Sequence, residues 1–182
     1  MENVSGLRKG KMKLIFAEMT KALKDTGYKV SCRELNASWY GVPQDRRRLI
    51  WVGVRQDLAA MPGHPEPTVT VPVSARRALG IDGTLRASQT PRITGSFTFP
   101  CNADRDAKSL GKPAGTIAAI RPPSLTDGES VRYLTIEESK VLQGFPEWFD
   151  IREKEYKFLG NSVCPPMAQA VGRHLLTLLE EV

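Results

Sequence analysis

Residues 28–55 read YKVSCRELNASWYGVPQDRRRLIWVGVR, and this stretch decides the fold. Tyr28, Val30 and Cys32 alternate with polar residues, as in a strand with one buried face. Residues 49–54 read LIWVGV, the continuous apolar run of a strand that is buried on both faces. We therefore expect two strands in this stretch.

The residues before this stretch have a helical pattern. Between positions 11 and 26 apolar residues recur three or four positions apart, and Gly27 follows them as a C-terminal cap. These apolar residues are Met12, Ile15, Phe16, Met19, Ala22 and Leu23. A helix of this length beside two strands predicts a piece of an α/β sheet.

Residues 61–123 lose this regularity. Proline, glycine, threonine and serine are frequent, and only short stretches such as 68–73 and 93–99 have a strand-like composition. We interpret this segment as a small, irregular, strand-rich domain.

Helical signals return near the C-terminus. Thr135 and Glu138 have the spacing of a capping box, which predicts the start of a short helix that Gly144 and Pro146 would end. A last helix is expected over about 166–179. Its apolar face would consist of Met167, Val171, Leu175 and Leu178.

The composition is that of an ordinary globular protein, with 41% apolar and 25% charged residues among 182. No apolar run approaches the roughly 18 residues of a membrane span, and the first ten residues lack a signal-peptide core. Cys32, Cys101 and Cys164 are far apart, which argues against a disulfide framework or a zinc site. We expect a protein of the reducing cytoplasm without a structural metal.

Positive charge is concentrated in the first third of the chain. The net charge is +7 over residues 1–55, +2 over residues 56–112 and −3 over residues 113–182. Such a distribution is typical of a protein that binds a polyanion on one side, although a solvated basic surface would give the same count.

Four short stretches carry a more specific signal. Residues 2–4 read ENV, and residues 40–48 read YGVPQDRRR. The stretch 132–146 runs from RYLTIEE to LQGFP, and residues 160–163 read GNSV. In this order and spacing they resemble the C-terminal portion of the cytosine-5 DNA methyltransferases. The resemblance covers nearly the whole chain and is weakest over 62–112, where the family has its variable target-recognition domain.

The resemblance implies an α/β fold, namely the second half of a Rossmann-like methyltransferase sheet with a small, irregular, β-rich target-recognition domain. Residues 1–60 would be the C-terminal part of the catalytic domain, and residues 61–130 the recognition domain. Residues 131–182 would be helices that return to the catalytic domain.

The resemblance also implies methyl transfer from S-adenosylmethionine to carbon 5 of a cytosine that is flipped out of DNA. A cysteine thiolate adds to carbon 6, so that charge builds on the ring and must be stabilised. Glu2 matches the acid that faces ring nitrogen 3, and Arg46 and Arg48 match the arginines of the QxRxR motif that supply the donor to the ring oxygen and its support. Without the resemblance, Glu2 would be an exposed terminal residue and the arginines a basic strand entry or a phosphate-binding patch.

Asn161 and Ser162 match residues that the family places near its S-adenosylmethionine pocket. The same two residues could cap the N-terminus of the last helix, and both roles can coexist. In the recognition segment, the residues expected to bind DNA are Arg76, Arg77, Arg86 and Arg92.

Two parts of the family do not occur in this sequence: the glycine-rich cofactor loop and the Pro-Cys-Gln nucleophile loop, which both precede ENV. Pro100 and Cys101 are followed by Asn102 rather than Gln, and they lie inside the recognition segment. We therefore do not expect Cys101 to be a nucleophile, and we expect Cys32 and Cys164 to be core residues.

The sequence thus predicts the C-terminal part or subunit of a split or truncated DNA (cytosine-5-)-methyltransferase with an incomplete cofactor pocket. Alone it would be inactive and prone to self-association, since half a sheet leaves strand edges unpaired. Its partners would be double-stranded DNA, in a bacterial or phage nucleoid, and a complementary N-terminal half. The alternatives are a non-catalytic DNA-binding remnant or module, and a segment cut from a longer protein.

Overall fold

The computed structural model describes residues 1–81, 92–94, 107–119, 123–126, 131–151 and 156–180. The chain forms two compact units. Unit 1 contains residues 1–36, 47–67 and 169–182, and unit 2 contains residues 37–46 and 68–168. The functional division into 1–60, 61–130 and 131–182 stays a prediction.

Within its described residues, unit 1 is built on a three-stranded antiparallel sheet with the order β1-β3-β2. β1 is Glu2–Val4, β2 is Tyr28–Asn36 and β3 is Arg47–Arg55. β3 pairs on both sides, and residues 48–52 within it are all buried. Its central position explains the apolar run from which a buried strand was expected.

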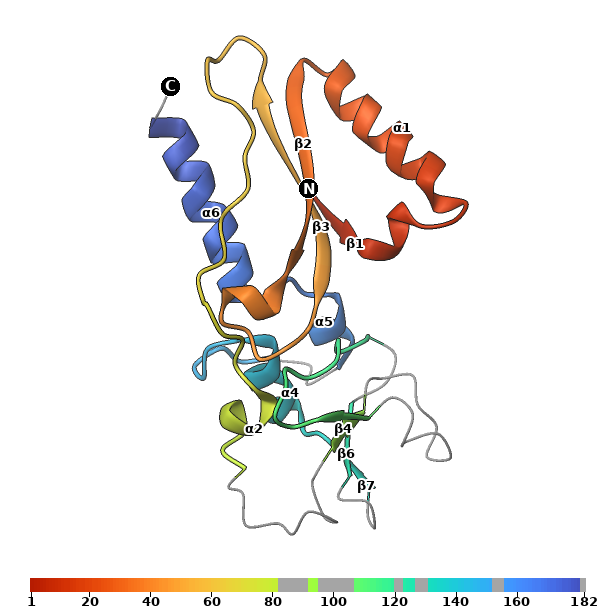
Figure 1. Cartoon of the computed structure of the whole chain (residues 1–182), viewed down its shortest axis with the longest axis vertical. Coiled ribbons are helices and arrows are strands. Elements are labelled where there is room, and N and C mark those ends of the chain that lie inside the picture. The colour runs from red at the N-terminus through yellow and green to blue at the C-terminus, as the bar shows by residue number, and fades with distance from the viewer. Residues whose placement is uncertain (82–91, 95–106, 120–122, 127–130, 152–155, 181–182) are drawn as a thin grey trace. The chain divides into compact units, whose positions relative to one another are not determined.

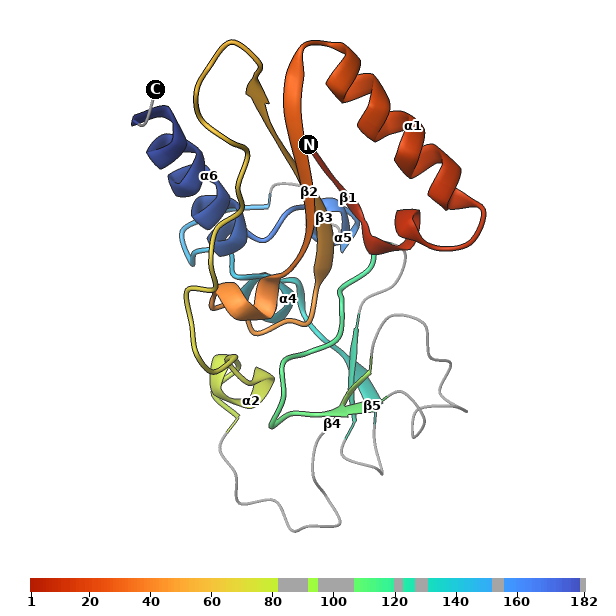
Figure 2. The same ribbon diagram turned by 45° about the horizontal axis from the view of Figure 1, so that its top comes forward.

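Helix α1 (Met12–Asp25) follows the short helix η1 (Ser5–Arg8) and lies along the sheet (Figures 1 and 2). Its inner side packs on a small core around Trp51: the Phe16 and Trp51 ring centroids are 5.4 Å apart. The indole Nε1 of Trp51 donates to Thr20 Oγ1 at 3.0 Å. Gly27, at φ 85°, ends the helix as predicted, because only glycine adopts this left-handed conformation without strain.

Helix α6 (Pro165–Glu180) begins in unit 2, and its residues from 169 onward belong to unit 1. The helix was expected over about 166–179, and that prediction is confirmed. In unit 1, α6 and α1 lie on opposite sides of the sheet (Figures 1 and 2). In the part of the chain that the structure describes, no helix is long and apolar enough to cross a membrane.

Unit 2 contains short antiparallel strands in the order β5-β4-β6-β7 among its described residues. These are β4 (Arg92–Thr94), β5 (Ala107–Ser109), β6 (Ser124–Thr126) and β7 (Val131–Tyr133). Its described helices are η2 (Ala37–Tyr40), α2 (Ala75–Ala78), α4 (Ile136–Gln143), α5 (Tyr156–Asn161) and the start of α6. They enclose a core that includes Leu110, Ile117, Leu134, Leu142 and Leu159.

The capping box at the start of α4 is confirmed. Thr135 Oγ1 accepts from the Glu138 amide at 3.1 Å, and the Glu138 carboxylate accepts from the Thr135 amide at 2.8 Å. Gly144 closes the helix at φ 79°. Both ends of α4 are therefore set by residues that local pattern identifies.

The strand expected at 68–73 is wrong. The amides of Thr68 and Val69 both donate to the carbonyl of Trp39, and Val71 is exposed. The segment is a loop in the structure, where these two amides bind one carbonyl rather than successive residues of a partner strand. Of the second stretch, residues 93 and 94 belong to a described strand, as expected, and residues 95–99 lie outside the described residues.

Candidate active site

Glu2 and Arg48 meet across two neighbouring strands of unit 1. In the register of β1 and β3, Glu2 lies opposite Ile50, two positions from Arg48 on the same face of the sheet. The Nε atom of Arg48 lies 2.8 Å from Glu2 Oε1, and the two side chains are 10% and 32% exposed. Arg48 Nη1 also donates to the carbonyl of Arg47 at 2.8 Å. The guanidinium therefore fixes the direction of a half-buried carboxylate.

Arg46 has different surroundings, within unit 2. Its side chain is 1% exposed. Nη1 donates to Ile117 O at 3.0 Å, and Nη2 donates to Gly160 O at 2.6 Å and Ser162 O at 2.8 Å. Of the two motif arginines, Arg48 contacts Glu2, whereas Arg46 holds the backbone around Asn161.

Ser162 directly follows α5. Its hydroxyl donates to Leu159 O at 2.8 Å, and the Nε2 atom of Gln143 donates to that hydroxyl at 3.0 Å. Asn161 is the last residue of α5 and is exposed. The two predicted cofactor residues therefore lie at the C-terminal end of one helix, one of them held and the other facing solvent.

The interpretation of Asn161 and Ser162 as the N-terminal cap of the last helix is wrong. α6 begins at Pro165, and the carbonyl of Cys164 accepts from Ala168 at 3.0 Å as the first bond of the helix. Proline is favoured at the first helical position because its missing N–H would find no intrahelical partner there. The two prolines thus place the helix start three residues beyond Ser162.

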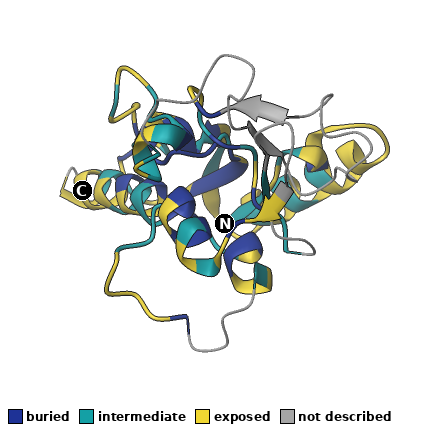
Figure 3. Ribbon diagram, turned by 90° about the horizontal axis from the view of Figure 1, so that it is seen from below, coloured by how far each residue is buried: buried dark blue, intermediate teal, exposed yellow. Residues whose placement is uncertain are grey.

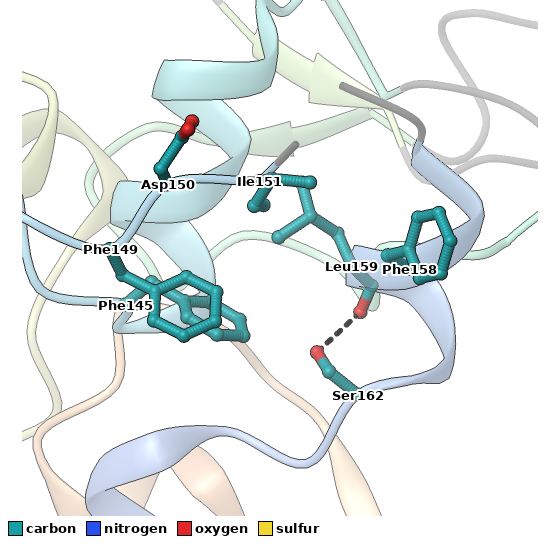
Figure 4. A pocket seen from close by; sticks show the side chains of 7 residues that line it. All are labelled: Phe145, Phe149, Asp150, Ile151, Phe158, Leu159 and Ser162. Carbon is teal, nitrogen blue, oxygen red and sulfur yellow. Dashed lines mark hydrogen bonds between the residues drawn. The ribbon is translucent and has the colours of Figure 1, made fainter. Parts of the chain in front are cut away.

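A pocket of about 480 Å³ opens in unit 2 beside Ser162 (Figure 4). Its walls are mainly apolar, and the ring centroids of Phe145 and Phe149 are 5.0 Å apart. The lining residues are Phe145, Phe149, Asp150, Ile151, Phe158, Leu159 and Ser162. Sequence reasoning missed these aromatic residues, although LQGFPEWF and KFLGNSV join them to two recognised motifs.

The predicted DNA-binding arginines are described only in part. Arg76 and Arg77 lie in α2, which starts where the Ser74 hydroxyl accepts from the Arg77 amide; Arg76 is half-buried and Arg77 exposed. Arg86 lies outside the described residues. Arg92 belongs to β4 by its backbone, and its side chain is outside the description. The structure thus allows Arg77 to contact a ligand from solvent.

The two described cysteines are core residues, as expected. Cys164 is buried, and Cys32 is half-buried against the core around Trp51, where burial raises the pKa of its thiol. Cys101 lies outside the described residues. Among the described residues, no group of three or more potential metal ligands comes together.

Comparison with known proteins identifies the family. The family model of the C-5 cytosine-specific DNA methylases matches residues 1–94 and 76–177. The type II methyltransferase M.BspRI of Lysinibacillus sphaericus is 30% identical over 96% of this chain and 49% of its own length. M.BsuRI of Bacillus subtilis is 30% identical over 93% of this chain and 47% of its own length.

The solved structure of S. pombe Dnmt2 methyltransferase superposes with a TM-score of 0.61 at 17% identity, over 98% of this chain and 66% of that one. This likeness establishes an α/β methyltransferase fold. The chain spans about half the length of M.BspRI and M.BsuRI. Since the family model matches nearly all of its residues, the chain belongs to the C-5 cytosine-specific DNA methylases.

Proposed function

We propose that the chain is the C-terminal part of a DNA (cytosine-5-)-methyltransferase that methylates carbon 5 of a flipped cytosine. It acts together with an N-terminal segment that carries the cysteine nucleophile and the glycine-rich cofactor loop. The observation that carries the proposal is the contact of 2.8 Å between Glu2 and Arg48, because it joins the ENV and QxRxR motifs in one half-buried pair.

In this proposal, Glu2 acts on the cytosine ring. When the cysteine adds to carbon 6, negative charge develops on the ring, and Glu2 in its protonated form donates a hydrogen bond from its carboxyl O–H to ring nitrogen 3. Arg48 holds the carboxyl group in place through Oε1 and offers a permanent positive charge beside the ring oxygen. Both groups are fixed by the pairing of β1 with β3, so they need little reorganisation during the reaction.

The residues beside Ser162 fit one side of a cofactor site. S-adenosylmethionine, when bound, supplies an electrophilic methyl group. The pocket of about 480 Å³ offers phenyl rings to an adenine base, Ser162 offers a polar group in its lining, and the exposed Asn161 precedes Ser162 in the chain. We assign Asn161 and Ser162 to hold the cofactor, with the remaining walls supplied by the N-terminal segment.

Two features of unit 1 support a partner segment. β1 pairs with β3 on one edge and is the outermost of the described strands of this sheet, so its other edge can pair with a further strand. No residue of α1 is buried, and the helix has only the intermediate and exposed colours in Figure 3. Leu14 is 72% exposed. Since the chain spans about half the length of M.BspRI and M.BsuRI, the N-terminal segment of the enzyme is the occupant that we propose for this surface.

The test is a methylation assay with and without that segment. The polypeptide encoded immediately upstream should contain the glycine-rich loop and Pro-Cys-Gln. Incubated with this chain, duplex DNA and labelled S-adenosylmethionine, it should give label at cytosine, whereas this chain alone should give none. Glu2→Gln should lower the rate at least about 100-fold, the scale for losing a group that stabilises charge in a transition state.

The matched control is Glu34→Gln. Glu34 also pairs with an arginine on the neighbouring strand, since its Oε1 lies 3.5 Å from Arg47 Nη1. This substitution should leave the methylation rate within about twofold of that of the unsubstituted enzyme. Label incorporated by the isolated chain would overturn the proposal. So would an upstream sequence without Pro-Cys-Gln. Duplex binding without methylation by the paired polypeptides would favour the alternative, a DNA-binding module, to which the net charge of +7 over residues 1–55 also points.

A further inference from the structure

Three polar side chains are fully buried together in unit 2: Gln44, Arg46 and Gln143, at 0%, 1% and 0% exposure. They come from two of the four sequence motifs and contact a third, GNSV. Burial of an amide or a guanidinium is unfavourable unless its polar atoms form hydrogen bonds, so their common position requires an explanation.

Gln44 is the first member of the network. Its Nε2 donates to Gln143 Oε1 at 2.7 Å and to Leu142 O at 3.3 Å, and its Oε1 accepts from the Ile117 amide at 3.3 Å. Both the amide nitrogen and the amide oxygen of Gln44 are therefore hydrogen-bonded to buried groups of the protein. Because Gln44 donates to Gln143 Oε1, the amide oxygen of Gln143 faces Gln44 and its amide nitrogen faces away from it.

The amide nitrogen of Gln143 donates hydrogen bonds to the segment that contains Asn161. Nε2 lies 2.9 Å from Leu159 O, 3.3 Å from Ser162 O and 3.0 Å from Ser162 Oγ. Arg46 binds the carbonyls of Gly160 and Ser162 from another direction. The carbonyl oxygens on both sides of Asn161 are thus held by buried side chains, although the Asn161 side chain itself faces solvent.

We propose that Gln143 is a positioning residue for S-adenosylmethionine: oriented by Gln44, it fixes the Ser162 hydroxyl and the Asn161 backbone in the conformation that binds the cofactor. This inference rests on the proposed function of the chain. It gives the LQGFP motif a part in cofactor binding that its position at the end of α4 does not by itself suggest.

The experiment measures steady-state kinetics of the enzyme formed with the N-terminal segment. Gln143→Leu should raise KM for S-adenosylmethionine about tenfold, the effect of losing roughly one well-placed hydrogen bond, and leave KM for DNA within about twofold. In the Gln143→Leu background, Ser162→Ala should have little further effect on that KM, because the hydroxyl has already lost the hydrogen bond from Gln143 and keeps only its bond to Leu159 O.

Gln143→Glu separates positioning from simple packing. A protonated glutamic acid has the shape of glutamine and can donate to Ser162, whereas the ionised form cannot. KM for S-adenosylmethionine of this variant should therefore fall toward the wild-type value as the pH is lowered, and that of Gln143→Leu should not. Ser139→Ala is the matched control, since Ser139 is equally buried in the same helix and should leave all constants unchanged.

An inactive unsubstituted enzyme would overturn the proposed function. With an active one, three results would overturn this inference: unfolding of Gln143→Leu at the assay temperature, equal changes in both KM values, or a pH dependence of Gln143→Glu that matches that of Gln143→Leu. Each would show that the amide serves only the core of unit 2.

Discussion

At the scale of single residues, Gly160 shows why a motif can require glycine. A Cβ atom on Gly160 would lie 2.2 Å from the Ala119 nitrogen and 2.4 Å from the Ala118 carbonyl carbon. Both are backbone atoms, which cannot move aside as the end of a flexible side chain can. The first residue of GNSV is therefore small because the 118–119 backbone passes directly against α5.

Replacing Gly160 with alanine should destabilise the chain. We expect Gly160→Ala to lower the free energy of unfolding by about 2 kcal/mol, since overpacking against backbone outweighs the better helix propensity of alanine. Gly172→Ala in α6 is the control: nothing lies within 4 Å of its Cβ position, so it should be neutral or stabilising. Urea unfolding measures both, and equal effects of the two substitutions would contradict the explanation.

The residue scale is also where the sequence says least about contacts. The guanidinium of Arg46 binds carbonyls of residues 71, 114 and 116 positions further along the chain. No periodicity or local pattern contains contacts over such separations. The alternation of Arg46 and Arg48 predicts that they share a motif, but not that Arg48 contacts Glu2. The role of Arg46 toward the cytosine stays a prediction.

At the scale of elements, local signals were more reliable. The Thr135–Glu138 spacing predicted the start of α4, Gly27 predicted the end of α1, and the run 49–54 predicted a buried strand, because each effect arises within a few residues. The strand predicted at 68–73 does not form, because a strand also needs a neighbouring strand to pair with and the local composition does not supply one. The start of α6 near residue 166 was predicted correctly, but its cap was not: Asn161 and Ser162 favour capping positions, whereas Pro165 and Pro166 form the first turn.

The capping box of α4 gives a pH-dependent prediction. The guanidinium of Arg132 donates to both carboxylate oxygens of Glu138, at 2.7 and 2.8 Å, and lowers the pKa of that carboxyl; the Thr135 amide adds to the effect. A carboxyl whose pKa is lower in the folded state stabilises the fold above its unfolded-state pKa. That contribution is lost as the pH falls through the lowered value.

Glu138→Gln should therefore destabilise the chain at pH 7 and have less effect in acid. We expect a loss of about 1 kcal/mol at pH 7, a modest value because Arg132 is half-exposed and the pair is screened by water. The difference from the unsubstituted chain should shrink as the pH falls below about 4.5, the ordinary pKa of glutamate. Urea unfolding of both proteins at pH 7 and pH 4 measures it; a constant difference would exclude the ion pair as its cause.

At the scale of the whole molecule, the charge distribution predicts how the chain should bind DNA. The net charge is +7 over residues 1–55 and −3 over residues 113–182. Phosphate binding releases counterions, so the affinity for a duplex should fall steeply with salt even without the N-terminal segment. Arginines that contact phosphates should contribute to the salt slope, whereas an arginine buried against a carboxylate should not.

Arg77 and Arg48 provide this comparison. Arg77 is exposed in α2, and Arg48 is 10% exposed and paired with Glu2. In the isolated chain, Arg77→Ala should weaken duplex binding and reduce the slope of log K against log salt by about one. Arg48→Ala should leave that slope unchanged, and in the enzyme formed with the N-terminal segment it should lower turnover about 100-fold. Filter binding at several salt concentrations, with methylation rates measured in parallel, tests both. If Arg48→Ala flattens the slope and spares turnover, Arg48 binds phosphate, and Glu2 must act on the base without it.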